Sequence, residues 1–315
     1  MNVRRPHISG AALAAVAVLG IGSLSACSTD SAAADGRFDV VASFYPMQFL
    51  AERIGGDHVH VTTLTEPGQE PHELELSLRQ RAELEESDAA LYLSGLQPSV
   101  DEAIDQAGLK TKIDAAHLTR LEDHGDVEHD HGGEEHPEEE EHSLDPHVWL
   151  DPVKYAEIAE GVGTAFAKAD PDHAADYRKN TDALVDRLQA LDTEFRDGLK
   201  NTKTKVFFTN HASFGYFAER YGLTQEAISG VDPESEPSPA RIRELREEAR
   251  ADGVTTVFYE TLVSGKTAKT LADDAGLRTD VLDPLEGLTD RSKGDDYFAV
   301  MEANLTALKK ALGAR

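Results

Sequence analysis

The chain has 315 residues and a formal net charge of −28, from 59 acidic and 31 basic side chains. Such an acidic excess argues against nucleic acid or an anionic surface as partner and suits a protein that attracts cations. The length is enough for two domains or one large one.

The first 26 residues have the features of a secretory signal peptide. A basic start precedes an apolar run at 11–22 that is shorter than the roughly 20 residues of a membrane span. Cys27 is the only cysteine, so no internal disulfide is expected. It ends the stretch LSAC, which resembles the lipobox of bacterial lipoproteins. That resemblance implies that Cys27 is lipidated, that 27–36 is a flexible tether, and that the protein is anchored at the extracytoplasmic face of the plasma membrane.

Short β-rich runs alternate with helical patterns in the next part of the chain. Two helical patterns separate the β-rich runs 38–44, 58–65 and 89–95. The first starts at Pro46, and the second covers 75–88. Strands that alternate with helices indicate parallel β/α units. We therefore predict an N-terminal β/α lobe over residues 37–168.

A long amphipathic pattern begins after Pro171. Apolar side chains recur there at spacings of four and three residues, which predicts one helix of up to about 29 residues. It is expected to link two lobes over residues 169–201. The residues of its apolar stripe are Tyr177, Thr181, Leu184, Leu188, Leu191, Phe195 and Leu199.

The β/α alternation restarts beyond this helix. Strands are predicted at 205–210, 254–260 and 279–284, with helices that end near Tyr221, start at Lys266 and start at Asp295. These elements predict a C-terminal β/α lobe over residues 202–315. The fold class is therefore α/β, with two lobes of mostly parallel sheet joined by one long, rigid helix.

Four polar residues are expected directly after predicted strands: His72, His147, His211 and Glu286. Ligands of open α/β sheets bind outside the carboxyl ends of the strands. Each lobe holds two of these residues, and each pair is 75 residues apart, which suggests a repeated lobe plan. Three imidazoles and one carboxylate suit Zn²⁺, whereas Mn²⁺ prefers more oxygen ligands.

Several motifs resemble the zinc-binding branch of the metal-specific solute-binding proteins of ABC transporters. They are GQEPHELELS, DPHVWLDP, TNHASFGYFAERYGL, ESEPSP and LDPLEGL, and they occur in order from about residue 38 to the end. The resemblance implies two β/α lobes with the metal in the cleft between them. It also implies a monomeric receptor, not an enzyme, that carries Zn²⁺ as its transported ligand to the membrane permease of an ABC importer.

Carried over position by position, the resemblance implies His72, His147 and His211 as metal ligands. The fourth ligand is expected to be Glu286, with Asp283 held in reserve. Asp145 and Asp151 flank the second histidine, and we interpret them as turn or cap residues or as outer partners of the site.

Two other functions remain open at this point. The same fold could bind Mn²⁺ or Fe²⁺, or the chain could be an extracytoplasmic zinc hydrolase. A catalytic zinc site keeps one coordination position open, whereas three histidines and Glu286 would fill all four. Nothing in the sequence tests an adhesin or metallochaperone role.

Residues 124–142 form a histidine-rich and acidic segment that resembles the loop of many zinc-binding members. It is too polar to fill a core and too flexible to hold one geometry, whereas a tight site needs ligands on rigid elements. We predict that it captures Zn²⁺ weakly and passes it on; the alternative is an inert acidic linker. Its histidines are His124, His129, His131, His136 and His142.

Overall fold

The computed structural model describes residues 36–124 and 144–314. The predicted signal peptide, nearly all of the tether with Cys27, and His129, His131, His136 and His142 lie outside the described residues. Within them, no helix combines the length and the apolar composition needed to cross a bilayer.

The first half of the chain builds a parallel four-stranded sheet in the order β2-β1-β3-β4. Aliphatic residues of the central strands are buried, and Ser77 caps the second helix in a reciprocal capping box with Gln80. The elements are β1 (Phe38–Ala42), α1 (Tyr45–Gly55), β2 (Val59–Thr63), α2 (Leu78–Glu86), β3 (Ala89–Tyr92), α3 (Pro98–Gln106) and β4 (Thr111–Asp114).

The second half repeats this plan. Its parallel sheet has the order β6-β5-β7-β8, which is the same order of strands as in the first sheet. The repeated plan suggested by the sequence is therefore present. The elements are β5 (Val206–Thr209), α6 (Gly215–Tyr221), β6 (Thr224–Ala227), α7 (Pro239–Ala251), β7 (Thr256–Tyr259), α8 (Lys266–Ala275) and β8 (Arg278–Val281).

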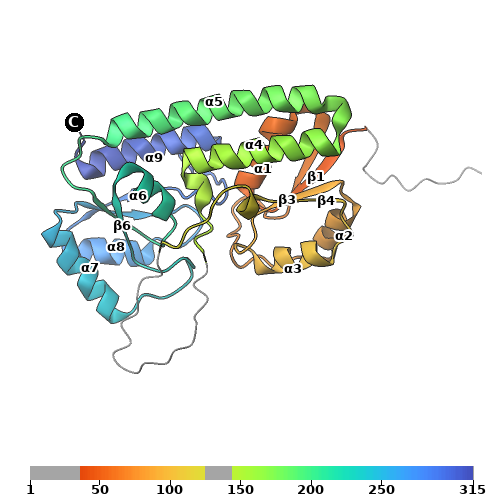
Figure 1. Ribbon diagram of the computed structural model, residues 1–315. Helices are drawn as coiled ribbons and strands as arrows, with labels where there is room; N and C mark the ends of the chain where they lie inside the picture. Colours follow the sequence, from red (N-terminus) through yellow and green to blue (C-terminus); the bar gives the residue numbers. More distant parts are fainter. Residues whose placement is uncertain (1–35, 125–143, 315) are drawn as a thin grey trace, which may run out of the picture. The chain divides into compact units, whose positions relative to one another are not determined.

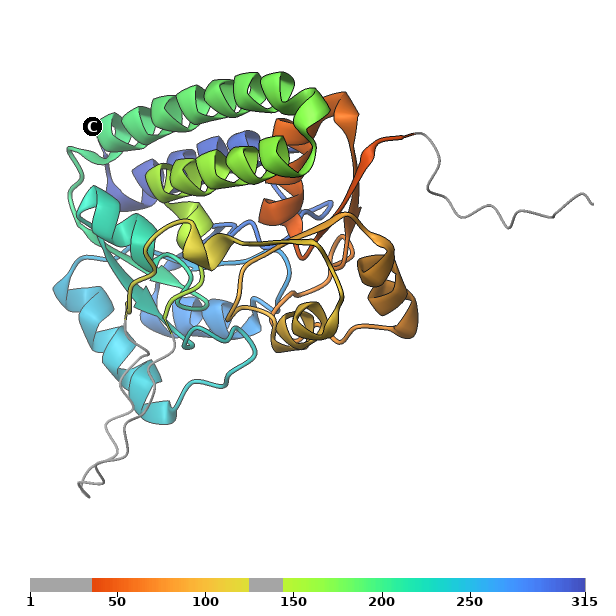
Figure 2. The same ribbon diagram turned by 45° about the vertical axis from the view of Figure 1, so that its right-hand side comes forward.

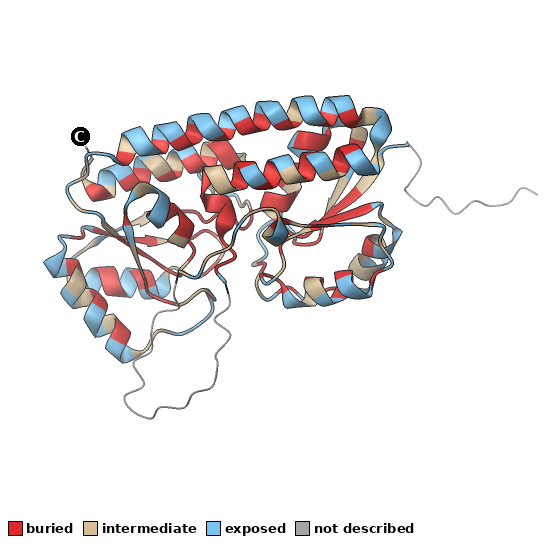
Figure 3. Cartoon of the chain, viewed as in Figure 1, coloured by how far each residue is buried: buried red, intermediate tan, exposed pale blue. Residues whose placement is uncertain are grey.

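Long helices connect the two halves. Helix α4 (Pro152–Ala169) runs beside α5 (Ala174–Leu199), which also packs on α1 and on the last helix, α9 (Tyr297–Leu312) (Figures 1 and 2). Helix α5 has 26 residues, fewer than the predicted maximum, because a 3₁₀ turn at Pro171–His173 precedes it. All seven residues of the predicted stripe are buried, and the opposite face of α5 is exposed (Figure 3).

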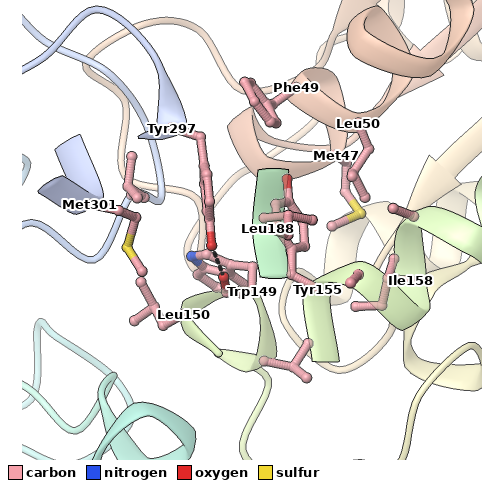
Figure 4. Packing of buried hydrophobic residues seen from close by; sticks show 14 of the residues in the cluster. Met47, Phe49, Leu50, Trp149, Leu150, Tyr155, Ile158, Leu188, Tyr297 and Met301 are labelled. Atoms are coloured by element: carbon pink, nitrogen blue, oxygen red, sulfur yellow. Dashed lines mark hydrogen bonds between the residues drawn. The ribbon is translucent and has the colours of Figure 1, made fainter. Parts of the chain in front are cut away.

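One hydrophobic core continues from the first sheet into the second, from Val40 of β1 to Phe207 of β5. Trp149 lies in this core, where its indole Nε1 donates to the carbonyl oxygen of Pro284 at 2.7 Å. Tyr297 donates its hydroxyl to the carbonyl oxygen of Trp149 at 2.7 Å (Figure 4). Because buried polar groups are costly when unpaired, these bonds fix the segments of both halves against one another.

The predicted fold class is confirmed, while the exact domain boundaries stay a prediction. Five elements were not predicted: α3, β4, α4, β6 and α7. Strands β4 and β6 are sheet edges, half exposed and largely polar, so they lack the apolar run that marks a central strand. Helix α7 is mostly charged and buries only Arg241, Leu245 and Ala249.

Helices α4 and α5 approach closely at Gly163, which gives a test of the packing. A Cβ atom there would lie 2.1 Å from Thr181 Oγ1, an atom held by its bond to the carbonyl oxygen of Tyr177. We expect Gly163→Ala to lower the free energy of unfolding, because overpacking costs about 1–3 kcal/mol and exceeds the gain of about 1 kcal/mol in helix propensity.

Chemical denaturation of the metal-free protein measures this effect. The loss should shrink when the same change is made in a Thr181→Ala background, where the clashing hydroxyl is absent. A Gly163→Ala protein that is more stable than the wild type would contradict the close packing of α4 on α5.

Candidate metal centre

The four predicted residues lie together between the two sheets. His72 lies in the segment between β2 and α2, His211 follows β5 by two residues, and Glu286 follows β8. His147 is placed differently from the prediction. It directly precedes a 3₁₀ turn at Val148–Leu150, and the preceding strand, β4, ends at Asp114. Among residues 115–124 and 144–147, which the structure describes before the turn, no strand ends at His147.

One carboxylate oxygen is the centre of the cluster. Glu286 Oε1 lies 3.4 Å from the Nε2 atom of His72 and 3.2 Å from the Nε2 atoms of both His147 and His211. His147 and His211 Nε2 are themselves 3.3 Å apart. His147, His211 and Glu286 are 0% exposed, and the side chain of His72 is 11% exposed.

These distances match the spacing of ligands around a tetrahedral ion. Zn²⁺ binds nitrogen and oxygen at about 2.0–2.2 Å, so tetrahedral ligand atoms lie about 3.3–3.5 Å from each other. Glu286 Oε2 is buried and has no hydrogen-bond partner within the described part of the chain. A buried carboxylate oxygen without a donor is costly, and a cation at this point would satisfy it.

Two of the histidines are oriented by carboxylates on their other ring nitrogen. His147 Nδ1 lies 2.8 Å from Asp145 Oδ1, which also accepts from the backbone N–H of His147. His211 Nδ1 lies 2.6 Å from Glu260 Oε1. A carboxylate on Nδ1 leaves Nε2 as the ligand atom and makes it more basic, as is usual for histidines that bind metals.

Glu260 was not predicted as part of this site. It ends the predicted strand 254–260, so the placement rule that selected His211 and Glu286 would also have found it. Asp145, in contrast, has the role of outer partner that was considered for it.

Burial, neighbouring charges and hydrogen bonds shift the pKa values of the cluster strongly. Burial lowers the pKa of His211, but the negative charges of Glu260 and Glu286 outweigh it and raise this pKa well above its usual value. Burial raises the pKa of Glu286, yet the charge of His211 and bonds from the histidines hold it well below its usual range. The pKa of His147 is raised as well, so without metal the protons of His147 and His211 offset the charge of the buried carboxylate.

The reserve ligand Asp283 lies outside the cluster. Its carboxylate is buried and accepts hydrogen bonds from the hydroxyls of Thr261 and Ser292 and from the backbone N–H of Leu285. Leu285 has a φ of +60°, a left-handed conformation that is rare for leucine. The hydrogen bond that Leu285 N–H donates to Asp283 supports this strained turn, and the turn brings the next residue, Glu286, to the histidines.

Asp151 has the predicted role of a cap residue. It accepts from the backbone N–H of Val153 at the start of α4 and forms an ion pair with Arg220 of α6. It therefore supports the helix that follows the site and does not orient an imidazole.

Two α/β halves with buried imidazole and carboxylate groups between them are typical of two-lobed binding proteins that hold a metal ion. Comparison with known families agrees: the family described as zinc-uptake complex component A, periplasmic, matches residues 40–311. The chain belongs to this family.

Individual relatives are similar over most of this chain. The zinc-binding lipoprotein AdcA of Streptococcus pneumoniae is 38% identical over 297 residues, which are 91% of this chain and 58% of AdcA. The chain thus spans little more than half the length of AdcA. The high-affinity zinc uptake system protein ZnuA of Bacillus subtilis is 34% identical, over 92% of this chain and 93% of that protein. The crystal structure of Zn(II)-bound AdcA superposes with a TM-score of 0.73 at 36% identity, over 88% of this chain and 58% of that one.

The protonated cluster predicts how stability without metal depends on pH. A histidine whose pKa is raised in the folded state stabilises the fold below its unfolded pKa of about 6.5. That contribution is lost as the pH rises through the raised folded pKa. Metal-free protein should therefore lose stability as the pH rises through the pKa of His211. Glu286→Gln should reduce this loss of stability, because it removes an anion that raises the pKa of His211.

Denaturation of both proteins over a range of about pH 6 to 9 measures the difference. Asp192→Asn is the matched control, since Asp192 is a buried carboxylate of α5 that pairs with Arg196 and is no member of the cluster. Equal pH dependence in wild type and Glu286→Gln would contradict a protonated cluster centred on Glu286.

Proposed function

We propose that this protein is the zinc-binding receptor of an importer and that it holds one Zn²⁺ with His72, His147, His211 and Glu286. The observation that carries the proposal is the geometry of the cluster. Four distances between ligand atoms are 3.2–3.4 Å, which is close to the spacing around a tetrahedral ion. The names of the relatives, a zinc-binding lipoprotein and a zinc uptake protein, support the same ion.

Zn²⁺ fits this ligand set better than Mn²⁺ or Fe²⁺. Three imidazole nitrogens and a single carboxylate form a compact, nitrogen-rich shell, whereas Mn²⁺ prefers more oxygen ligands. At a given site the Irving–Williams order also places Zn²⁺ above both Mn²⁺ and Fe²⁺. Selection of Zn²⁺ therefore follows from both the donor atoms and their spacing.

A receptor is favoured over a zinc hydrolase for a related reason. Hydrolysis needs a coordination position for water, and the four ligands here fill a tetrahedron. The four ligand side chains are also buried or nearly buried, which limits the access of a substrate to the ion. We propose that the site stores and releases the ion and does not use it for catalysis.

We further propose that the receptor delivers Zn²⁺ to the membrane permease of an ABC importer. It would act as a monomer at the extracytoplasmic face of the plasma membrane, anchored by a lipid on Cys27. The family description as a component of a zinc-uptake complex supports such a partner. Cys27 and most loop histidines lie outside the described residues, so lipidation and weak zinc capture by 124–142 rest on the sequence alone.

Competition between metals tests the proposed ion. The purified, metal-free protein should bind one Zn²⁺ tightly and Mn²⁺ far more weakly, because nitrogen ligands favour Zn²⁺ over Mn²⁺. Competition calorimetry with both ions, followed by elemental analysis, measures the preference. Equal or tighter binding of Mn²⁺ would overturn the zinc assignment.

Single substitutions test the ligand set. His147→Ala and His211→Ala should each weaken the tight site by about 100-fold or more, which exceeds the 10–100-fold typical of an outer partner. Glu286→Ala should weaken it less, because water can replace one carboxylate oxygen. Asp283→Ala is the comparison: if it is far more damaging than Glu286→Ala, then the fourth ligand has been assigned wrongly.

Lipidation is tested in a bacterial host that processes lipoproteins. Cys27→Ala should release the protein from the membrane or leave the leader uncut, since the modified side chain is gone. Fractionation and mass spectrometry of the N-terminus give the answer. Normal processing with unchanged membrane retention would refute the anchor.

A further inference from the structure

A second group of possible metal ligands lies next to the first site. It consists of Glu122, of His124, which is the first residue of the histidine-rich segment, and of Glu219 of α6. One ligand atom from each residue lies within 4.8 Å of the others, and His124 Nε2 is 3.2 Å from Glu219 Oε2. We infer that these three side chains form a second, weaker binding site for a divalent cation of the zinc class.

His124 has the orientation of a metal ligand. Its Nδ1 lies 2.7 Å from Asp145 Oδ2, so its Nε2 points toward Glu219. This is the same carboxylate–imidazole arrangement that positions His147 and His211 in the first site. Asp145 serves both sites, with Oδ1 on His147 and Oδ2 on His124.

The ring of His124 fits a position that the neighbouring residues leave open for it. A Cβ atom on Gly215 would lie 2.5 Å from His124 Cγ, so only glycine leaves room for the imidazole at the start of α6. Tyr216 packs edge-on against the ring with centroids 4.2 Å apart. The hydroxyl of Tyr216 also accepts from the backbone N–H of Glu122 and donates to the carbonyl oxygen of Asp145.

Tyr216 thus holds both described ends of the segment that carries the other four histidines. His124 was predicted to belong to a flexible capture segment, but its contacts distinguish it from a freely moving histidine. A preorganised ligand costs less entropy to order when the ion binds, which raises its affinity over that of a mobile one.

Charge and composition make this site weaker than the first. It offers one nitrogen and two carboxylates, and Glu219 is mostly exposed. Lys154 Nζ lies 3.1 Å from Glu122 Oε1 and competes with a cation for that carboxylate. The site is therefore suited to a lower affinity than the buried tetrahedron.

The assignment of the ion rests on the proposed function, whereas the site itself rests on the three side chains. A weaker site that shares Asp145 with the tight one suits the passage of Zn²⁺ from the acidic segment to His147. The two ions remain distinct ligands, so their binding can be counted separately.

The experiment uses full-length protein in which His129, His131, His136 and His142 are changed to Asn. Titration with Zn²⁺ alone, read by calorimetry and by elemental analysis after equilibration, should show one tight and one weaker ion. His124→Gln and Glu219→Gln should each remove the weaker ion and retain the tight one. His117→Gln is the matched control, because His117 is exposed and pairs with Asp114 away from both sites.

Lys154→Gln supplies a change of opposite sign. It removes the cation that competes for Glu122 and should tighten the weaker site by several-fold while the tight site stays unchanged. Two ions bound in every variant, or one ion bound in all of them including the control, would overturn the second site. If the protein that carries only the four His→Asn changes binds no tight ion, the proposed function is overturned instead.

Discussion

The buried carboxylate of Glu286 is the constraint on which the metal centre depends. An unpaired charge in a protein interior is costly, and Glu286 lies within 3.4 Å of three imidazole nitrogens. The pKa values of His147 and His211 are raised, so without metal their protons offset this charge, and we propose that a metal ion replaces them. Because Asp145 and Glu260 bond to the Nδ1 atoms of His147 and His211, an ion bound at the proposed site would meet side chains that are already oriented.

The rest of the fold keeps these ligands at fixed distances. They come from segments far apart in the sequence, and the continuous core under α4, α5 and α9 joins those segments. Trp149 lies two residues after His147 and bonds to Pro284, two residues before Glu286. One indole therefore connects a ligand segment of the first half to a ligand segment of the second, which limits how far the halves can separate around the ion.

Much of this architecture could be predicted from the sequence. The stripe of α5 and the central strands have strong apolar periodicity, so the two-lobed α/β class followed from local patterns. The candidate residues were found because polar side chains follow strands. Glu260 was missed although it obeys the same rule, and the position of His147 was not explained by it. The distances between ligands, and the fixed position of His124 against Gly215, depend on tertiary packing that no local pattern encodes.

The central claim is that the tight ion is held by three imidazoles and the carboxylate of Glu286. X-ray absorption at the zinc edge, on protein loaded with one equivalent, measures this shell directly. We expect four nitrogen or oxygen ligands at about 2.0–2.2 Å, with outer-shell scattering from three imidazole rings. The number of imidazoles should fall to two in His211→Ala and stay at three when His129, His131, His136 and His142 are replaced by Asn. A number of imidazoles that falls with the loop histidines, and not with His211, would contradict the proposed ligand set.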